Sequence, residues 1–159
     1  MQDRPSFDEI YMDLAQNLAR KSHCVKIKVG AVLTKDTRIV SLGYNGPPAG
    51  THNCDEEWPE TGCPRDSKGS CSLALHAEQN AILYASKNNV SVDGCTLYIT
   101  LSPCLACARI IYTMGIKRVF DLIVGGLICI VALPLMALVA LVIQIDSRGP
   151  VFVRQERKG

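Results

Sequence analysis

The chain has 159 residues, enough for one ordinary domain with a buried core, and carries a formal net charge of +2. Such a small charge gives little electrostatic attraction for nucleic acid, so no nucleic-acid partner is expected. The mean hydropathy of +0.15 is high for a soluble domain, and the uncharged stretch after Asp121 is its main source. The 8 cysteines accompany a charged N-terminus without a secretory signal. Metal ligation in the cytoplasm is therefore the leading interpretation.

The first elements predicted along the chain are a helix, a hairpin and a long loop. Ser6-Phe7-Asp8-Glu9 is a capping-box pattern, and apolar residues then recur at helical spacing, which predicts a helix over about 7–20. The stretch GAVLTKDTRIVSLGYNG predicts a β-hairpin, because two apolar runs flank a polar pair. Residues 47–72 are rich in Gly, Pro, acidic residues and Cys, and a loop of this length usually has a function or needs a cross-link.

The next part of the chain alternates helices with strands. LALHAEQNAILYASKN predicts a helix, and CTLYIT predicts a buried strand. Ser102 and Pro103 are predicted as the N-cap and first residue of a helix that ends at Gly115, after which IKRVF opens another strand. This order predicts a mixed α/β sheet covered by helices. The candidate core positions of the first of these helices are Leu75, Ala81, Ile82 and Ala85.

Two short motifs carry the residues for metal chemistry: HAE at 76–78 and PCLAC at 103–107. Cys104 and Cys107 are one helical turn apart, so both sulfurs can face one point, and a helix N-terminus favours their thiolate form. With His76 they make three Zn²⁺ ligands and leave a fourth position for water, beside which Glu78 is the expected proton carrier. This pairing of motifs is the signature of zinc nucleobase deaminases. The alternative is a closed Cys/His zinc site with Glu78 as an ordinary surface carboxylate.

The stretches GYNGPPAG, HNCDE, HAEQNAILYA and LYITLSPCLACARIIYTMGIKRV resemble the deoxycytidylate (dCMP) deaminases of bacteria and phages, over about residues 6–119. The resemblance implies a cytidine-deaminase-like three-layer α/β sandwich, with helices on both faces of a mixed sheet, in a domain at 1–118. It implies Zn²⁺ on His76, Cys104 and Cys107, and hydrolysis of dCMP to dUMP with Glu78 as proton shuttle. Family members continue beyond GIKRV with a helix and a strand. The sheet is therefore expected to be C-terminally incomplete, with an unpaired edge.

The resemblance also suggests contacts for the substrate. Asn45 lies in the GYNG stretch that lines the family's nucleotide site; the alternative is a turn residue with left-handed backbone before Gly46. Lys26 stands where the family often has arginine, and is a candidate phosphate contact or a solvated surface lysine. A deaminase of another base, such as adenine in tRNA or a pteridine-like precursor, is an alternative. The GYNG stretch and the Cys-rich insertion favour dCMP. A homo-oligomer, formed if the sheet is completed, and a deoxynucleotide triphosphate effector are further implications.

Several relatives hold a second, structural zinc in the region of the Cys-rich loop, and a loop that cannot fold by burial is a sensible place for one. The alternative is a set of unpaired cytosolic thiols. Cys95 and Cys129 lie in apolar runs and are interpreted as small core or membrane-facing residues. The favoured ligands of the second zinc are Cys24, Cys54, Cys63 and Cys71, with His52 as a substitute.

The end of the chain predicts a different environment. Residues 122–143 contain no charged side chain and would span about 33 Å as a helix, enough for the hydrocarbon core of a bilayer. Pro134 near the middle and basic residues on both flanks favour a hairpin attached to the cytoplasmic face of the membrane. A straight span or a buried soluble helix is the alternative.

The stretch from KRVFDL to RQERKG resembles the N-terminal membrane segment of bacterial sugar transferases, the polyprenol-phosphate phosphoglycosyl transferases, over about residues 117–159. The catalytic Asp-Glu pair of that family lies further downstream. Residues 119–159 are therefore expected to form a separate membrane-associating segment with a basic tail, and residues 117–119, which fit both patterns, are interpreted as a junction. The second hypothesis of function is a membrane-anchoring fragment of a glycan-initiating transferase fused to an inactive deaminase.

Overall fold

The computed structural model describes residues 4–60, 63–67 and 69–121. The chain divides into two units, Met1–Ile123 and Val124–Gly159, and the described fold lies in the first. The predicted membrane-associating stretch at 122–143, which includes Cys129, lies outside the described residues. Over the described ranges, no helix has both the length and the apolarity needed to cross a membrane.

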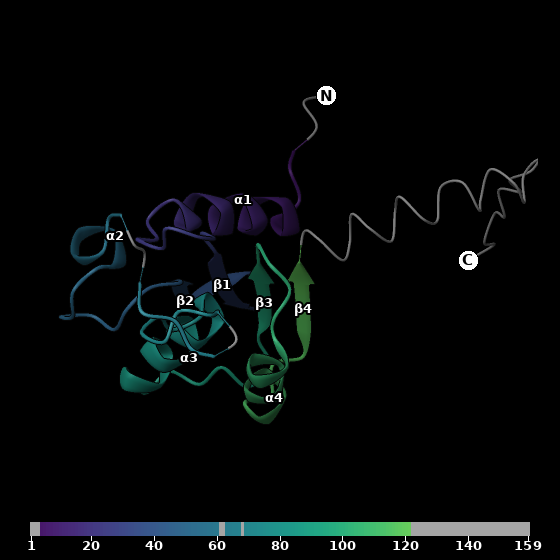
Figure 1. Cartoon of the computed structure of the whole chain (residues 1–159). Coiled ribbons are helices and arrows are strands. Elements are labelled where there is room, and N and C mark those ends of the chain that lie inside the picture. Colours follow the sequence, from purple (N-terminus) through teal and green to yellow (C-terminus); the bar gives the residue numbers. More distant parts are fainter. Residues whose placement is uncertain (1–3, 61–62, 68, 122–159) are drawn as a thin grey trace, which may run out of the picture. The chain divides into compact units, whose positions relative to one another are not determined.

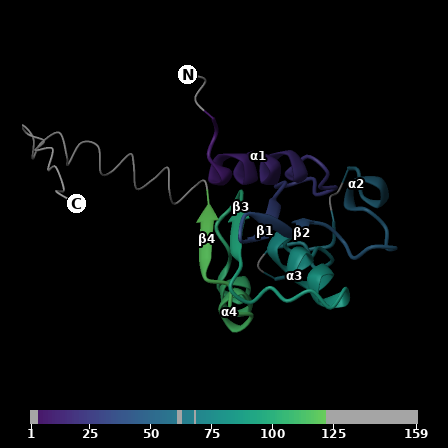
Figure 2. The ribbon, with the colours of Figure 1, turned by 180° about the vertical axis from the view of Figure 1, so that it is seen from behind.

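The described residues form a mixed four-stranded sheet with helices on both faces (Figures 1 and 2). The strand order is β2-β1-β3-β4; β1 is antiparallel to β2 and β3, and β3 is parallel to β4. Helix α1 covers one face, and α3 and α4 cover the other, which agrees with the expectation of helices on both faces. The elements are α1 (Phe7–Ala19), β1 (Gly30–Lys35), β2 (Arg38–Tyr44), α2 (Cys54–Glu57), α3 (Ala77–Lys87), β3 (Thr96–Ile99), α4 (Leu105–Thr113) and β4 (Arg118–Asp121).

Local sequence explains how the first half of the fold forms. The capping box that the sequence predicts is present: the Glu9 amide donates to Ser6 Oγ at 3.2 Å, and the Ser6 amide donates to Glu9 Oε2 at 2.6 Å. Asp36 and Thr37 connect β1 to β2 with φ of 49° and 61°. Both values are left-handed, as a two-residue turn between antiparallel strands requires. The predicted first helix and hairpin are thus confirmed.

The core has two parts, one on each face of the sheet. The part under α1 centres on Tyr11, Ala15, Val32 and Tyr98, and the part under α3 and α4 is larger. Of the predicted core positions in α3, Ala81, Ile82 and Ala85 are buried. Leu75 is only half-buried and precedes the helix, where its amide and carbonyl form hydrogen bonds with Gly46.

The start of α4 differs from the prediction. Cys104 is the N-cap residue and the helix runs from Leu105, so Ser102 and Pro103 precede the cap. The backbone of Cys104 is extended, with φ of −68° and ψ of 165°, so the helix begins after it, and the Ser102 hydroxyl donates to Asp121 Oδ1 at the end of β4, at 3.1 Å. This shift places Cys104 at the helix start and Cys107 in the first turn. The short helix α2, inside the predicted loop, was not expected either.

Gly43 fixes the distance between β2 and α3. A Cβ at this position would overlap the carbonyl oxygen of Ala77 and lie 2.6 Å from the amide nitrogen of Ala81. We expect Gly43→Ala to lower the free energy of unfolding by about 2–4 kcal/mol, because α3 must move away from the sheet. Gly46→Ala is the matched control, since a Cβ there meets no atom within 4 Å. Urea unfolding of the full chain measures both, and equal losses in the two variants would contradict the prediction.

Candidate metal centre and active site

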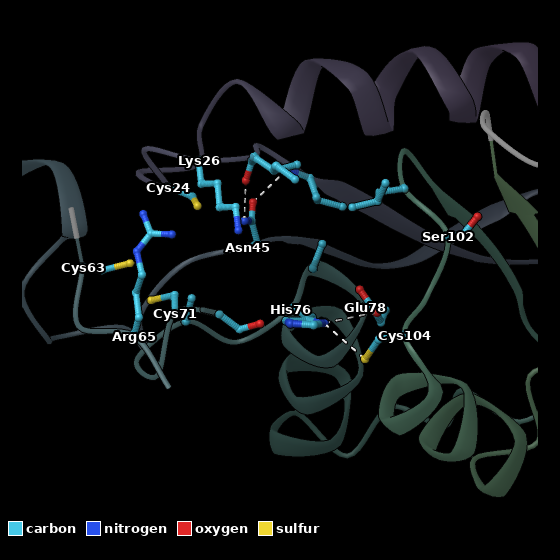
Figure 3. Close-up of a pocket in the computed structure, with 16 residues that line it drawn as sticks. Cys24, Lys26, Asn45, Cys63, Arg65, Cys71, His76, Glu78, Ser102 and Cys104 are labelled. Carbon is cyan, nitrogen blue, oxygen red and sulfur yellow. Dashed lines mark hydrogen bonds and ion pairs between the residues drawn. The ribbon is translucent and has the colours of Figure 1, made fainter. Parts of the chain in front are cut away.

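A cavity of about 280 Å³ lies at the N-terminal ends of α3 and α4. Its walls come from four parts of the chain that are distant in sequence (Figure 3). The segment before β1 supplies Lys26, the end of β2 leads to Asn45, and the Cys-rich loop supplies residues between Cys63 and Cys71. The fourth wall contains His76, Glu78 and Cys104. The motifs singled out from the sequence therefore meet in one place.

The three predicted zinc ligands converge at one side of this cavity. His76 Nδ1 lies 3.3 Å from Cys107 Sγ and 3.7 Å from Cys104 Sγ. Tetrahedral zinc, with bonds of about 2.0–2.3 Å, separates its ligand atoms by roughly 3.3–3.8 Å. These two distances therefore fit a zinc ion held by the three side chains. His76 is the N-cap residue of α3 as Cys104 is of α4, so the start of each helix positions its ligand.

Three ligands leave one coordination position for a reactant. Among the residues that the structure describes, no fourth Cys, His, Asp or Glu joins the group of His76, Cys104 and Cys107. A closed zinc site would need such a ligand, so this geometry favours the open, catalytic kind of site.

Glu78 lies beside the three ligands and is not a surface carboxylate. Its side chain is 3% exposed, and Oε1 lies 3.9 Å from His76 Nδ1. Figure 3 shows its carboxylate on the same side of the cavity as His76 and Cys104. The alternative of an ordinary surface residue is therefore wrong. A carboxylate buried beside an open metal position is placed to exchange protons with a bound water.

The local electrostatics of this cluster favour a cation. Burial raises the pKa of the Cys107 thiol above its usual range, and a hydrogen bond with Glu78 adds to the increase. Both effects disfavour the thiolate, because the sulfur is removed from water and lies next to a carboxylate. A divalent cation at the sulfur would reverse this by stabilising the thiolate. The donor set and its surroundings thus fit zinc.

A second cluster of thiols lies in the Cys-rich loop. The sulfurs of Cys54, Cys63 and Cys71 all lie within 4.8 Å of one another, and those of Cys54 and Cys71 are 3.9 Å apart. Cys24 lines the cavity with Cys63 and Cys71 but is not part of the three-sulfur group. His52 is directed elsewhere: its side chain is 82% exposed and lies 3.5 Å from Glu57. Three of the four favoured ligands are therefore brought together.

The pKa values of these thiols differ according to their surroundings. Burial, followed by the proximity of Cys71, raises the pKa of Cys54 to about 12. The pKa of Cys71 is lowered. Burial is the largest single effect and raises this pKa, but the hydrogen bonds from Cys63 and from the backbone at Leu73 and Ala74 together outweigh it. Backbone donors around one sulfur are a suitable setting for a metal-bound thiolate.

Asn45 lines the cavity, and its side chain also has a structural role. Its Oδ1 accepts from the Val29 amide at 2.7 Å, and its Nδ2 donates to the Ile27 carbonyl at 2.8 Å. It is not among the described residues with positive φ, so the left-handed turn alternative is wrong. By holding the backbone at residues 27 and 29, Asn45 also positions Lys26, which lines the same cavity and is exposed.

Sequence reasoning missed Arg65, which lines the cavity from the Cys-rich loop. Its position between Cys63 and Cys71 was the available signal, because residues between neighbouring ligand cysteines stay close to the site. His23, Asp55 and Glu56 form a further cluster of candidate ligand atoms, with His23 Nδ1 2.8 Å from Asp55 Oδ1. His23 is half-buried and the two acidic residues are exposed, and exposed acidic groups are common without a metal.

The fold and the open Cys/His centre are those of a zinc-dependent deaminase, and comparison with known families agrees. Residues 5–122 match the family described as the cytidine and deoxycytidylate deaminase zinc-binding region. This match covers most of the chain, and the chain belongs to that family. Residues 112–159 match the bacterial sugar transferase family, which overlaps the first match at residues 112–122.

Individual relatives cover the same part of the chain. A deoxycytidylate deaminase of Mycobacterium phage D29 is 39% identical over an alignment of 128 residues that covers 73% of this chain and 94% of the relative. The deoxycytidylate deaminase of Schizosaccharomyces pombe is 42% identical over 123 residues, and the chain spans only 37% of its length. A crystal structure of the cyanophage S-TIM5 dCMP deaminase in complex with dCMP and dUMP is 36% identical, with a TM-score of 0.62 over 76% of this chain and 83% of that one.

Proposed function

We propose that the chain catalyses the hydrolytic deamination of dCMP to dUMP, with release of ammonia. The observation that carries the proposal is the open three-ligand centre with a buried glutamate beside it, at one side of a cavity large enough for a small ligand. The similarity to dCMP deaminases, among them one matched over 94% of its length, supports dCMP as the substrate.

In this proposal His76, Cys104 and Cys107 hold the catalytic zinc, which would supply a Lewis acid that lowers the pKa of a bound water. Glu78 is the proton carrier, because its carboxylate is buried beside the ligands and the residue lines the cavity. It takes a proton from the attacking water and returns protons to N3 and to the departing amine. One water is consumed, the C4–N4 bond breaks and the C4–O bond forms, so one ammonia leaves for each dUMP.

A second, structural zinc in the Cys-rich loop is part of the proposal. The close sulfurs of Cys54, Cys63 and Cys71 support it, and Cys24 on the wall of the neighbouring cavity is the expected fourth ligand. A metal there would cross-link α2 to the loop, which has little apolar surface to hold it in place.

We also propose the division of the chain into a deaminase domain at 1–118 and a membrane-associating, sugar-transferase-like segment at 119–159. The family match at residues 112–159 supports the second part. A transferase anchor carrying an inactive deaminase remains the second candidate, and loss of deamination activity would favour it. A homo-oligomer and a deoxynucleotide triphosphate effector stay predictions of the resemblance.

Comparison of substrates tests the proposed activity. We expect the zinc-loaded full chain to release ammonia from dCMP, and to act on cytidine or adenine in tRNA at least about 100-fold less efficiently, as kcat/KM. A site built to bind a phosphate rejects a substrate that lacks it, because its polar groups are then left unpaired. Ammonia release and the absorbance change of the pyrimidine provide two independent readouts. Turnover of cytidine without turnover of dCMP would contradict the proposal.

A further inference from the structure

We propose that Arg65 binds the phosphate of the substrate and determines the preference for a nucleoside monophosphate over the free nucleoside. This inference rests on the proposed function and names a residue for its specificity. Arg65 reaches the cavity from the loop between Cys63 and Cys71, outside the motifs that identify the chemistry.

The charges of the cavity are separated along its length. Lys26 and Arg65 both line the cavity, and in Figure 3 Arg65 lies on the side of Cys63 and Cys71, opposite Glu78 and Cys104, with the end of the Lys26 side chain between them near Asn45. No carboxylate lies within 4.0 Å of the Lys26 or Arg65 cationic groups in the part of the chain that the structure describes. Two cationic groups that line one cavity favour the binding of an anion there. A phosphomonoester carries about −1.5 to −2 charges at neutral pH, which matches this pair.

The geometry of arginine makes Arg65 the more specific of the two cations. A guanidinium binds two phosphate oxygens at once through parallel N–H donors, whereas an ammonium acts as a point charge. Arg65 Nη1 donates to the Gly69 carbonyl at 3.3 Å, which leaves the other donors of the group for a ligand. A phosphate held there would leave the rest of the nucleotide on the side of Glu78, because Arg65 and Glu78 lie on opposite sides of the cavity.

A small hairpin holds Arg65 in this position. Arg65 and Cys71 form an antiparallel bridge, the Ser72 amide donates to the Pro64 carbonyl at 2.9 Å, and the Asp66 amide donates to the Ser70 carbonyl at 2.8 Å. Cys63 and Cys71, at the base of this hairpin, are two of the three residues of the thiol cluster. The chain thus places a cation opposite the metal centre with an element that belongs to neither α3 nor α4.

The test compares substrates with and without the phosphate. For Arg65→Ala in the full chain we expect kcat/KM for dCMP to fall about 10- to 100-fold, the loss of a charge-assisted hydrogen-bonded pair, while kcat/KM for deoxycytidine stays the same. Arg65→Lys keeps the charge without the bidentate geometry, so its kcat/KM for dCMP should lie between those of the parent chain and Arg65→Ala. Arg38→Ala, which removes an exposed arginine at the start of β2, is the matched control and should change neither value.

Binding measurements separate this inference from the proposed function. Calorimetry in a Glu78→Gln background measures binding without turnover. There Arg65→Ala should weaken dCMP binding by the same factor of about 10- to 100-fold and leave deoxycytidine binding unchanged. Absence of dCMP turnover by the parent chain contradicts the proposed function, but the binding series still decides the role of Arg65. Equal losses for dCMP and deoxycytidine, no loss on replacing Arg65, or no dCMP binding at all would overturn the inference.

Discussion

Replacement of Glu78 by glutamine is expected to lower kcat for dCMP by about 10²–10⁴-fold while zinc stays bound. Glutamine has nearly the same volume and can keep the packing of a side chain that is only 3% exposed. It cannot accept and return a proton, however, and the proposed reaction requires that exchange more than once. Zinc content should not change, because the three predicted ligands are His76, Cys104 and Cys107.

The experiment compares turnover with metal content in the same preparations. Glu60→Gln, at an exposed glutamate of the Cys-rich loop, is the matched control and should retain full turnover. If Glu78→Gln retained turnover, Glu78 would have no part in the mechanism. Loss of zinc together with turnover would show that the carboxylate holds the metal centre together instead of carrying protons.

Removal of a zinc ligand is expected to have the second large effect. Cys107→Ala should weaken binding of the catalytic zinc by at least about 100-fold and abolish measurable turnover, because two ligands remain of three. Cys107 is fully buried, so the variant also loses packing around its sulfur. Zinc per chain, measured by atomic emission after dialysis, is expected to fall from two to one.

Two other cysteines separate ligation from burial. Cys95→Ala removes a sulfur that is equally buried, in the part of the core under α3 and α4. This variant should keep both zinc ions and turnover. Cys54→Ala should also reduce the zinc content to one per chain but leave the catalytic zinc in place, with lower thermal stability. A zinc content of two in Cys107→Ala, or of one in the parent chain, would contradict the proposed pair of metal sites.

The chemistry of the site was largely predictable because its residues lie in short local motifs. The spacing of Cys104 and Cys107 by one helical turn and the position of His76 before a periodic helix are properties of adjacent residues, which sequence reports directly. The helix at Phe7–Ala19 and the hairpin after it were predictable for the same reason, because cap and turn residues are within a few positions of one another. The polar pair that indicated the hairpin, Lys35 and Asp36, starts one residue before the turn at 36–37, since Lys35 is still in β1.

Competition between local and distant partners explains what the sequence could not predict. Ser102 has the features of a helix cap, yet its hydroxyl donates to Asp121, 19 residues away. Asn45 resembled a turn residue, but its amide bonds the backbone of residues 27 and 29, from the segment leading into β1. In each case a polar group has several partners of similar energy, and the fold decides which one is within reach.

The sequence by itself thus determined the class of chemistry, the zinc ligands to be expected and the mixed sheet, because these depend on residue type and short spacing. Only the tertiary structure decided that Glu78 is buried beside the ligands, that three sulfurs of the Cys-rich loop meet, and that Arg65 and Lys26 line the same cavity. These are contacts between segments tens of residues apart. Their existence depends on how the hairpin, the loop and the two helix starts pack together, which no local pattern specifies.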